Sequence, residues 1–235
     1  MNEKNCKLFA TPFSAEYWRL SAGELKSTRV LVLAALLTAL RIAIKSLKIS
    51  IGPNLTITFG FVINALGSAI YGPVVAAITS AISDTVGAVL FPSGTYFFPF
   101  TMVEMSGGII FALFFYRTKI TTMRVVLGRF AVTAICNLIM NPICMYYYYK
   151  IYYTEQVYAI FTVPRVVKNL ALFPLQALIL VIFFNALLPV TNRMDLTCTG
   201  NVKLKVGRRE IVAIVLLTVV SALAIAGYYW YRGLS

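Results

Sequence analysis

Histidine is absent from this 235-residue chain, and the sequence also lacks the common nucleotide-binding and hydrolase motifs. Without histidine there is no Ser-His-Asp or Cys-His nucleophile pair and no imidazole ligand for a metal ion. No G-x-x-x-x-G-K-S/T phosphate loop, G-x-G-x-x-G fingerprint or G-x-S-x-G elbow occurs. The four cysteines have no C-x-x-C spacing and are interpreted as structural thiols. We therefore expect no enzymatic activity or ATP hydrolysis by this chain, and no metal or cofactor.

Charged residues are scarce, at 12% of the chain, whereas 60% of the residues are hydrophobic and the mean hydropathy is +0.82. Because a soluble domain carries about 25% charged residues, this composition predicts an integral membrane protein in a lipid bilayer. Basic residues outnumber acidic ones 21 to 8, which gives a formal net charge of +13. Such a surplus on a soluble surface suggests nucleic-acid binding. Here the bases lie in short clusters between apolar runs, so we expect no nucleic-acid partner.

Seven apolar runs follow a polar N-terminal segment, and most approach the ~20 residues that a helix needs to cross ~30 Å of hydrocarbon. The runs cover residues 30–47, 57–71, 73–91, 97–116, 125–146, 166–190 and 211–231. We predict an all-α integral membrane protein with a six-helix bundle at residues 30–190. A cytoplasmic segment at residues 1–29 precedes it, and a cytoplasmic basic loop at 191–210 leads to an additional transmembrane helix at 211–231. Ser21 and Glu24 have capping-box spacing, which predicts that a helix begins there.

Most basic residues lie in residues 1–29 and in two clusters at residues 117–129 and 193–209. Because Lys and Arg accumulate in cytoplasmic loops, this distribution predicts a cell-membrane protein with a cytoplasmic N-terminus. Seven bases are then left on the outer side or in the outer half of a span: Arg41, Lys45, Lys48, Lys150, Arg165, Lys168 and Arg232. Topology does not explain these seven, so they are candidates for another role.

The first apolar run has two different faces. At about 100° per residue, Ala35, Ala39 and Ala43 fall on one stripe, and Arg41 and Lys45 lie on another side of the helix. Small residues four apart let a second helix approach closely in lipid. Two interpretations stay open: the stripe is a docking face for a partner, or it packs inside the bundle.

Two acidic residues are expected at one depth in neighbouring spans. Asp84 precedes the end of its run by seven residues, and Glu104 follows the start of the next run by seven, so each lies about 10 Å below the outer surface by helical rise. An ionisable residue at such depth is costly and is a candidate functional residue by default. The alternative is that each acid forms an ion pair with Arg41 or another base.

Further polar and aromatic residues are expected to face the same centre. Polar residues four apart on the fifth run are Arg129, Thr133, Asn137 and Asn141. One face of the sixth run carries Arg165, Lys168, Asn169 and Gln176. The aromatic residues Tyr96, Phe97 and Phe98 lie between the two acidic helices, whereas the tyrosines of residues 146–153 are interpreted mainly as an interfacial belt. This pattern fits an elongated ligand with a hydrogen-bonding head at depth and an anionic tail near the surface.

The sequence resembles the folate-type substrate-binding (S) components of energy-coupling factor (ECF) vitamin transporters. The resemblance covers residues 20–190 and rests on segments in a fixed order: residues 25–31, Gly72-Pro73, residues 83–88, residues 91–97 with Phe100-Thr101, Asn137 and Asn141, and residues 164–169 with Pro174. It implies a six-helix bacterial protein that binds its vitamin from outside. It also implies docking on a membrane coupling subunit through Ala35, Ala39 and Ala43, with ATP hydrolysed by two partner subunits. Residues 211–231 and the tyrosines of residues 146–153 depart from the family.

The resemblance implies folate as substrate, and the residues suit its chemistry. A pterin head presents two parallel N–H donors that match the two oxygens of one carboxylate, for which Asp84 is the first choice and Glu104 the second. The remaining proposed contacts are Arg41, Lys45, Arg165 and Lys168 for the dianionic tail, Asn137 and Asn169 as polar contacts, and Tyr96, Phe97 and Phe98 for stacking.

Three other functions are considered. The same scaffold can bind another vitamin, and a proton-coupled secondary carrier would titrate Asp84 and Glu104. A membrane aspartyl hydrolase would need a Tyr-Asp and a Gly-x-Gly-Asp motif, and neither occurs in the sequence.

Overall fold

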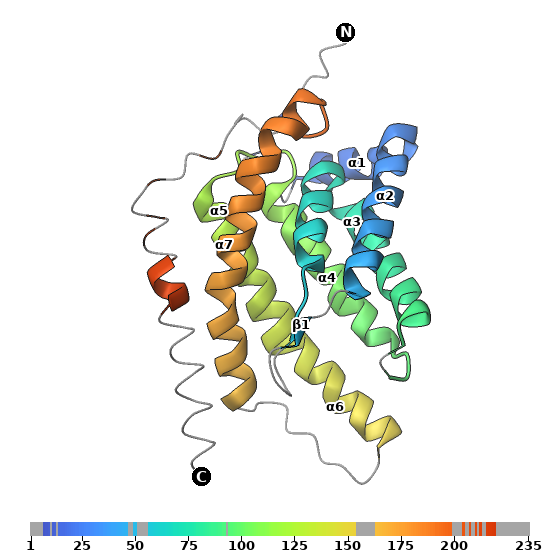
Figure 1. Cartoon of the computed structure of the whole chain (residues 1–235). Helices are drawn as coiled ribbons and strands as arrows, with labels where there is room; N and C mark the ends of the chain where they lie inside the picture. Colours follow the sequence, from blue (N-terminus) through green and yellow to red (C-terminus); the bar gives the residue numbers. More distant parts are fainter. Residues whose placement is uncertain are drawn as a thin grey trace. The chain divides into compact units, whose positions relative to one another are not determined.

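A computed structural model describes residues 7–9, 11–12, 14–46, 49–50, 56–92, 94–153 and 163–198, together with residues 204, 207, 210, 212 and 215–219. The elements in chain order are α1 (Ala15–Gly23), η1 (Glu24–Lys26), α2 (Thr28–Ser46), β1 (Ile49–Ser50), β2 (Thr56–Ile57), α3 (Gly60–Leu90), α4 (Phe98–Phe115), α5 (Thr122–Val132), the π-helix η2 (Thr133–Met140), α6 (Asn141–Tyr152) and α7 (Val163–Arg193). The two short strands pair antiparallel, with Ile49 opposite Ile57. The described chain is otherwise helical (Figure 1).

Four helices of the described residues are long and apolar enough to cross a membrane: α3, α4, the continuous helix from Thr122 to Tyr152, and α7. The pair α1 and α2 makes a fifth if this bent pair counts as one span. The all-helical membrane fold is therefore confirmed, whereas the count of six helices plus one is not. Most of the predicted helix at residues 211–231 lies outside the described residues. Within this range, residues 212 and 215–219 are described, and they are helical.

The chain divides into two compact units, which are described separately. The first contains residues 1–120 and 184–204, and therefore α1 to α4 with the end of α7. The second contains residues 121–183 and 205–235, and therefore α5, η2, α6 and most of α7.

In the first unit, α3 contains two of the predicted apolar runs and is broken between them. Gly72 has φ 76° and ψ −178°, which is not helical, and Pro73 has no N–H to continue the hydrogen-bond ladder. The two halves fold back on each other, because Ser80 Oγ in the second half donates to Asn64 Oδ1 in the first at 3.2 Å. The predicted boundary between residues 71 and 73 is thus present as a break in a helical hairpin.

The second half of α3 packs closely against α4. A Cβ atom added at Gly108 of α4 would lie 3.0 Å from the Ala76 carbonyl oxygen and 2.8 Å from Ser80 Oγ. The Gly108 carbonyl also accepts a hydrogen bond from Ser68 Oγ at 3.0 Å. Glycine at this position therefore lets the two backbones approach each other, which brings the polar faces of the two helices together.

The predicted capping box at Ser21 is wrong. Helix α1 begins at Ala15, and its N-cap is Ser14, whose side chain accepts from the Tyr17 N–H at 3.3 Å. Ser21 lies inside α1 and is fully buried, and its Oγ accepts from the Val74 N–H at 3.0 Å. The break in α3 leaves this N–H without a helical acceptor, so a distant serine satisfies it instead.

Glu24, the other half of the predicted box, bonds to the end of α4 instead. Its Oε1 accepts from Arg117 Nη2 and from the Tyr116 hydroxyl, both at 3.3 Å. Burial raises the pKa of Tyr116 to about 12, so this hydroxyl keeps its proton at neutral pH. The segment from α1 to η1 is therefore bonded to both α3 and α4.

In the second unit, residues 122–152 form one continuous helix whose middle part is the π-helix η2. Thr121 caps its start, since Oγ1 accepts from the Arg124 N–H at 3.3 Å. Pro142, just after η2, has no N–H to donate to the preceding turn. The expected stripe of residues four apart at 129, 133, 137 and 141 assumed an α-helical turn throughout. The prediction of a single straight stripe is wrong, because a π-helix has a wider turn and shifts the direction of later side chains.

Candidate functional site

Four ionisable side chains from three helices of the first unit come together as two ion pairs. We call this set, Arg41 and Lys45 of α2, Asp84 of α3 and Glu104 of α4, the acid–base cluster. Arg41 pairs with Glu104, and Lys45 pairs with Asp84. The ion-pair alternative raised for the two acids therefore describes both of them in this structure.

Both carboxylate oxygens of Asp84 accept hydrogen bonds. Lys45 Nζ donates to Oδ1, and Thr101 Oγ1 of α4 donates to Oδ2, both at 2.9 Å. The Tyr96 hydroxyl is hydrogen-bonded to Thr101 Oγ1 at 2.9 Å and to Thr85 Oγ1 at 3.2 Å. Asp84 is thus held by an ammonium and a hydroxyl, and Tyr96 extends this network to the start of α4.

Arg41 of α2 holds Glu104, which lies one turn after Thr101 on α4. Its Nη2 donates to Glu104 Oε2, and its Nη1 donates to Ser80 Oγ at 2.9 Å. The side chain of Arg41 is only 7% exposed, whereas that of Glu104 is 41% exposed. The pair is therefore asymmetric: the base is held inside the unit, and the acid keeps a large accessible surface.

The two acids lie on successive levels rather than at one depth. Thr101 bonds Asp84, and Glu104 follows Thr101 by three residues along α4, which is ~4.5 Å of helical rise. Arg41, which pairs with Glu104, also donates to Ser80. Ser80 lies one turn before Asp84 on α3. The sequence estimate counted from the ends of the apolar runs and so missed the offset between the two helices.

Two buried polar atoms beside the cluster have no hydrogen-bond partner within the described residues: Arg41 Nε and Ser83 Oγ. Leaving such a group unsatisfied costs about 1–3 kcal/mol. Arg41 also borders a narrow hollow between α2 and the α3 hairpin that has no room for a water molecule. Its lining residues are Leu37, Thr38, Arg41, Ile63, Asn64, Tyr71 and Thr79. The cluster is thus not fully satisfied by the protein's own groups.

The three aromatic residues predicted to stack on a ligand lie at the start of α4. Tyr96 joins the cluster through Thr101. Phe97 is the residue before α4 and makes an edge-to-face contact with Phe100 at a centroid distance of 5.7 Å. Phe98 is exposed. Of the three, Tyr96 is therefore the one that the structure connects to Asp84.

The alanine stripe of α2 is exposed along its length. Ala35, Ala39 and Ala43 are all accessible, whereas Thr38 and Arg41 are buried on the other side of the helix. The stripe is therefore not buried within the first unit. Small residues four apart on an exposed helix face permit the close approach of another helix in lipid.

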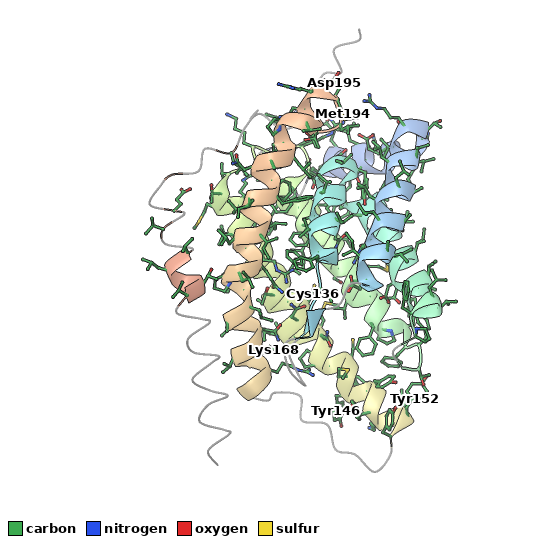
Figure 2. All side chains as sticks on the ribbon, viewed as in Figure 1. Cys136, Tyr146, Tyr152, Lys168, Met194 and Asp195 are labelled. Carbon is green, nitrogen blue, oxygen red and sulfur yellow. The ribbon has the colours of Figure 1, made fainter. Side chains whose placement is uncertain are left out.

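The other four predicted site residues belong to the second unit. Arg165, Lys168 and Asn169 lie near the start of α7, and Asn137 lies in η2; Figure 2 labels Lys168 on α7 and Cys136, next to Asn137 in sequence. Asn169 Nδ2 donates to the Arg165 carbonyl at 2.9 Å, within its own helix. All four are partly buried.

In the second unit, a polar contact joins the two long helices. Arg129 of α5 donates from Nε and Nη2 to Gln176 Oε1 of α7 at 3.1 and 2.5 Å. The sequence placed both residues on polar faces turned toward a common centre. This contact agrees with that placement for these two residues.

Asn64 is a residue of the network that sequence reasoning missed. Its Oδ1 accepts from Ser80, which in turn accepts from Arg41. A signal was present, because Asn64 is a single amide within a long apolar run, and a polar group at such a position needs a partner.

Comparison with known proteins gives consistent matches. The family described as the S component of the ECF-type riboflavin transporter matches residues 25–189. The folate transporter FolT of Clostridium novyi (strain NT) is 33% identical over 156 residues, which is 66% of this chain and 88% of that protein. FolT of Leuconostoc mesenteroides subsp. mesenteroides is 33% identical over 151 residues, or 63% of this chain and 80% of that protein. A crystal structure of FolT bound with folic acid is 30% identical, with a TM-score of 0.56, and the match covers 65% of this chain and 89% of that one.

Proposed function

This chain belongs to the folate-type S components of ECF transporters, a family of multi-pass membrane proteins, and we propose that it is the subunit that binds folate and delivers it across the membrane. The observation that carries the proposal is the match to a solved relative with bound folic acid at 30% identity. Every proposed site residue, from Ala35 to Asn169, falls within the matched residues 25–189. As a substrate-binding subunit, the chain itself performs no chemical step.

Asp84 is proposed to bind the pterin head. Lys45 and Thr101 bind its two oxygens and fix its orientation, while each carboxylate oxygen has capacity for a second hydrogen bond. The parallel N–H donors of the head can therefore bind without removing the existing partners. Tyr96 lies within the same network and offers a ring for stacking. Glu104 is the second choice, since Arg41 holds it and much of it remains accessible.

The tail of folate is proposed to bind Arg165 and Lys168 of α7, with Asn137 and Asn169 as further polar contacts and Phe97 and Phe98 against the benzoyl ring. The sequence assigned Arg41 and Lys45 to the tail as well. Their ion pairs support a different role, in which these bases hold the side chains of Glu104 and Asp84. Arg165 suits a dianionic tail, because arginine can hold a carboxylate in bidentate fashion.

Delivery is proposed to require partners. The exposed stripe of Ala35, Ala39 and Ala43 suits close contact with a helix of the membrane coupling subunit. Two ATPase subunits supply the energy. In this arrangement the N-terminus is cytoplasmic, as the distribution of basic residues favours.

A different vitamin is the second candidate, because the matched family is described by riboflavin transport. Riboflavin has a flat ring system but no dianionic tail, so it leaves Arg165 and Lys168 without a charged partner. A proton-coupled carrier is a third candidate. It is disfavoured because both acids are already held in ion pairs, Glu104 with Arg41 and Asp84 with Lys45.

Binding experiments with the purified full chain test the proposal. Native mass spectrometry should find folate among co-purified ligands, and calorimetry should give a dissociation constant for folate far below micromolar and much weaker binding of riboflavin. Pteroate, which has the head without the glutamate, should bind more weakly than folate. Glu16→Gln removes an exposed carboxylate on α1 and serves as the matched control. Tighter binding of riboflavin than folate contradicts the proposed substrate, and pH-driven transport by the chain alone in liposomes contradicts the proposed mechanism.

A further inference from the structure

Helix α1 lies across the end of α2 rather than continuing it. The segment from Ala15 to Lys26 meets the helix from Thr28 to Lys45 at 85°, and Figure 1 shows α1 beside the upper end of α2. Nineteen residues of α2 span ~28 Å by helical rise, close to the ~30 Å of bilayer hydrocarbon. By length α2 can therefore cover this thickness without α1, which leaves α1 able to lie along the membrane plane.

Hydrogen bonds fix which side of α1 faces the protein. Tyr17 has no exposed surface, and its hydroxyl donates to the Ala112 carbonyl of α4 at 2.8 Å. Ser21, four residues later, is bonded to the break in α3. The opposite side carries Ala15, Trp18 and Ala22, all exposed, with Trp18 at 39%. An indole on an outward face at the end of a transmembrane helix is typical of the membrane interface.

The same segment has cations that are not neutralised. Arg19, Lys26 and Arg29 are exposed, and none of them has a carboxylate partner among the described residues. Arg29 donates to the Met194 carbonyl, which leaves its charge in place; Figure 2 labels Met194 in the turn after α7. The two acids of the segment, by contrast, are already paired: Glu16 with Lys7 and Glu24 with Arg117.

We propose that α1 is an interfacial helix that binds the anionic lipid headgroups of the bilayer that α2 to α4 cross. Trp18 enters the boundary between headgroups and acyl chains, and Arg19, Lys26 and Arg29 bind lipid phosphates. The bilayer is the occupant because this surface lies at the end of a membrane-spanning helix and combines an outward indole with three cations. The inference is independent of the ligand, so it holds whether the chain binds folate or another vitamin.

Fluorescence quenching tests the position of α1. The chain has two tryptophans, so Trp230→Phe leaves Trp18 as the sole reporter in the full-length protein. In phosphatidylcholine nanodiscs, lipids brominated near the headgroup should quench Trp18 more than lipids brominated near the chain ends. Equal or stronger quenching from the chain ends would place α1 inside the hydrocarbon, and no quenching by either lipid would place Trp18 away from the bilayer. Either result overturns the proposal.

The lipid preference is tested in the same variant. Nanodiscs contain phosphatidylcholine and phosphatidylglycerol in equal parts, with the bromine on one or the other. Brominated phosphatidylglycerol should quench Trp18 more strongly, and each of Arg19→Gln and Lys26→Gln should lower this preference by roughly fivefold, the effect of one cation near an anionic surface. Lys150→Gln, which removes an exposed base from α6, should leave it unchanged. Equal quenching by the two lipids, or an equal effect of Lys150→Gln, contradicts specific binding of anionic headgroups by α1.

Discussion

Replacing Asp84 by asparagine separates a ligand-binding role from a purely structural ion pair. The carboxylate accepts from Lys45 and from Thr101, both at 2.9 Å. Asparagine has almost the same shape but one acceptor oxygen and an NH₂ group, which is a donor. The parallel donors of a pterin head would therefore meet one acceptor and one donor instead of two acceptors.

The expected loss of folate affinity follows from one charge-assisted hydrogen bond. Such a bond contributes about 1.5–3 kcal/mol, so affinity should fall by about 10- to 150-fold. The unliganded protein should also lose stability, because Lys45 keeps its charge without a counter-ion. Removing one partner of a fully buried pair costs about 3–5 kcal/mol. Since Lys45 and Asp84 retain 24% and 18% side-chain exposure, solvent screening lowers this to about 1–2 kcal/mol.

A second variant distinguishes the two effects. Lys45→Met combined with Asp84→Asn removes the unpaired ammonium, so the thermal unfolding midpoint without ligand should return toward that of the wild type. Folate affinity, measured by calorimetry, should remain at least tenfold lower in the double variant. Wild-type affinity in Asp84→Asn, or recovery of affinity together with stability in the double variant, would refute a direct contact between Asp84 and the ligand. Glu16→Gln should change neither quantity.

Three further predictions concern the helices that position the cluster. Ala39→Trp should abolish folate uptake in cells and leave folate binding by the purified chain unchanged, because the stripe is exposed; loss of binding would contradict a docking role. Gly108→Ala should lower stability by about 1–3 kcal/mol, since its Cβ would lie 3.0 Å from the Ala76 carbonyl oxygen; an unchanged thermal midpoint would contradict this packing. Ser21→Ala should lower stability by about 1–2 kcal/mol, because it removes the acceptor of the buried Val74 N–H, as hydrogen exchange at Val74 can measure.

The two faces of α2 and the break in α3 follow from the sequence because each depends on one local property. Helical periodicity alone separates Ala39 from Arg41, and the structure exposes the first and buries the second. The break follows from the Gly72-Pro73 pair, because glycine readily adopts a positive φ and proline has no N–H to continue the helical ladder. Predictions of this kind need no knowledge of neighbouring helices.

The sequence alone does not determine which base pairs with which acid, because this depends on how neighbouring helices are aligned. The contacts between α2 and the second half of α3 repeat every four residues on both helices. Arg41 bonds Ser80, and Lys45 bonds Asp84. This register is set by the packing of α2 against α3, where a Cβ atom added at Gly87 would lie 3.1 Å from Lys45 Cδ. The role of Ser21 is equally non-local, because its partner Val74 is 53 residues away. The π-helical turn of η2 was missed because periodicity arguments assume one turn size.

The two roles proposed for α2 involve different sides of one helix, and this arrangement makes the uptake experiment informative. Its exposed side carries Ala39, and its buried side carries the two bases that hold Glu104 and Asp84. A helix with side chains is about 10–12 Å across, so substitutions on the two sides share no partner and should act independently. A tryptophan at position 39 therefore adds bulk only where a partner helix would approach. Loss of uptake with retained binding would consequently assign the exposed side to docking and the buried side to capture.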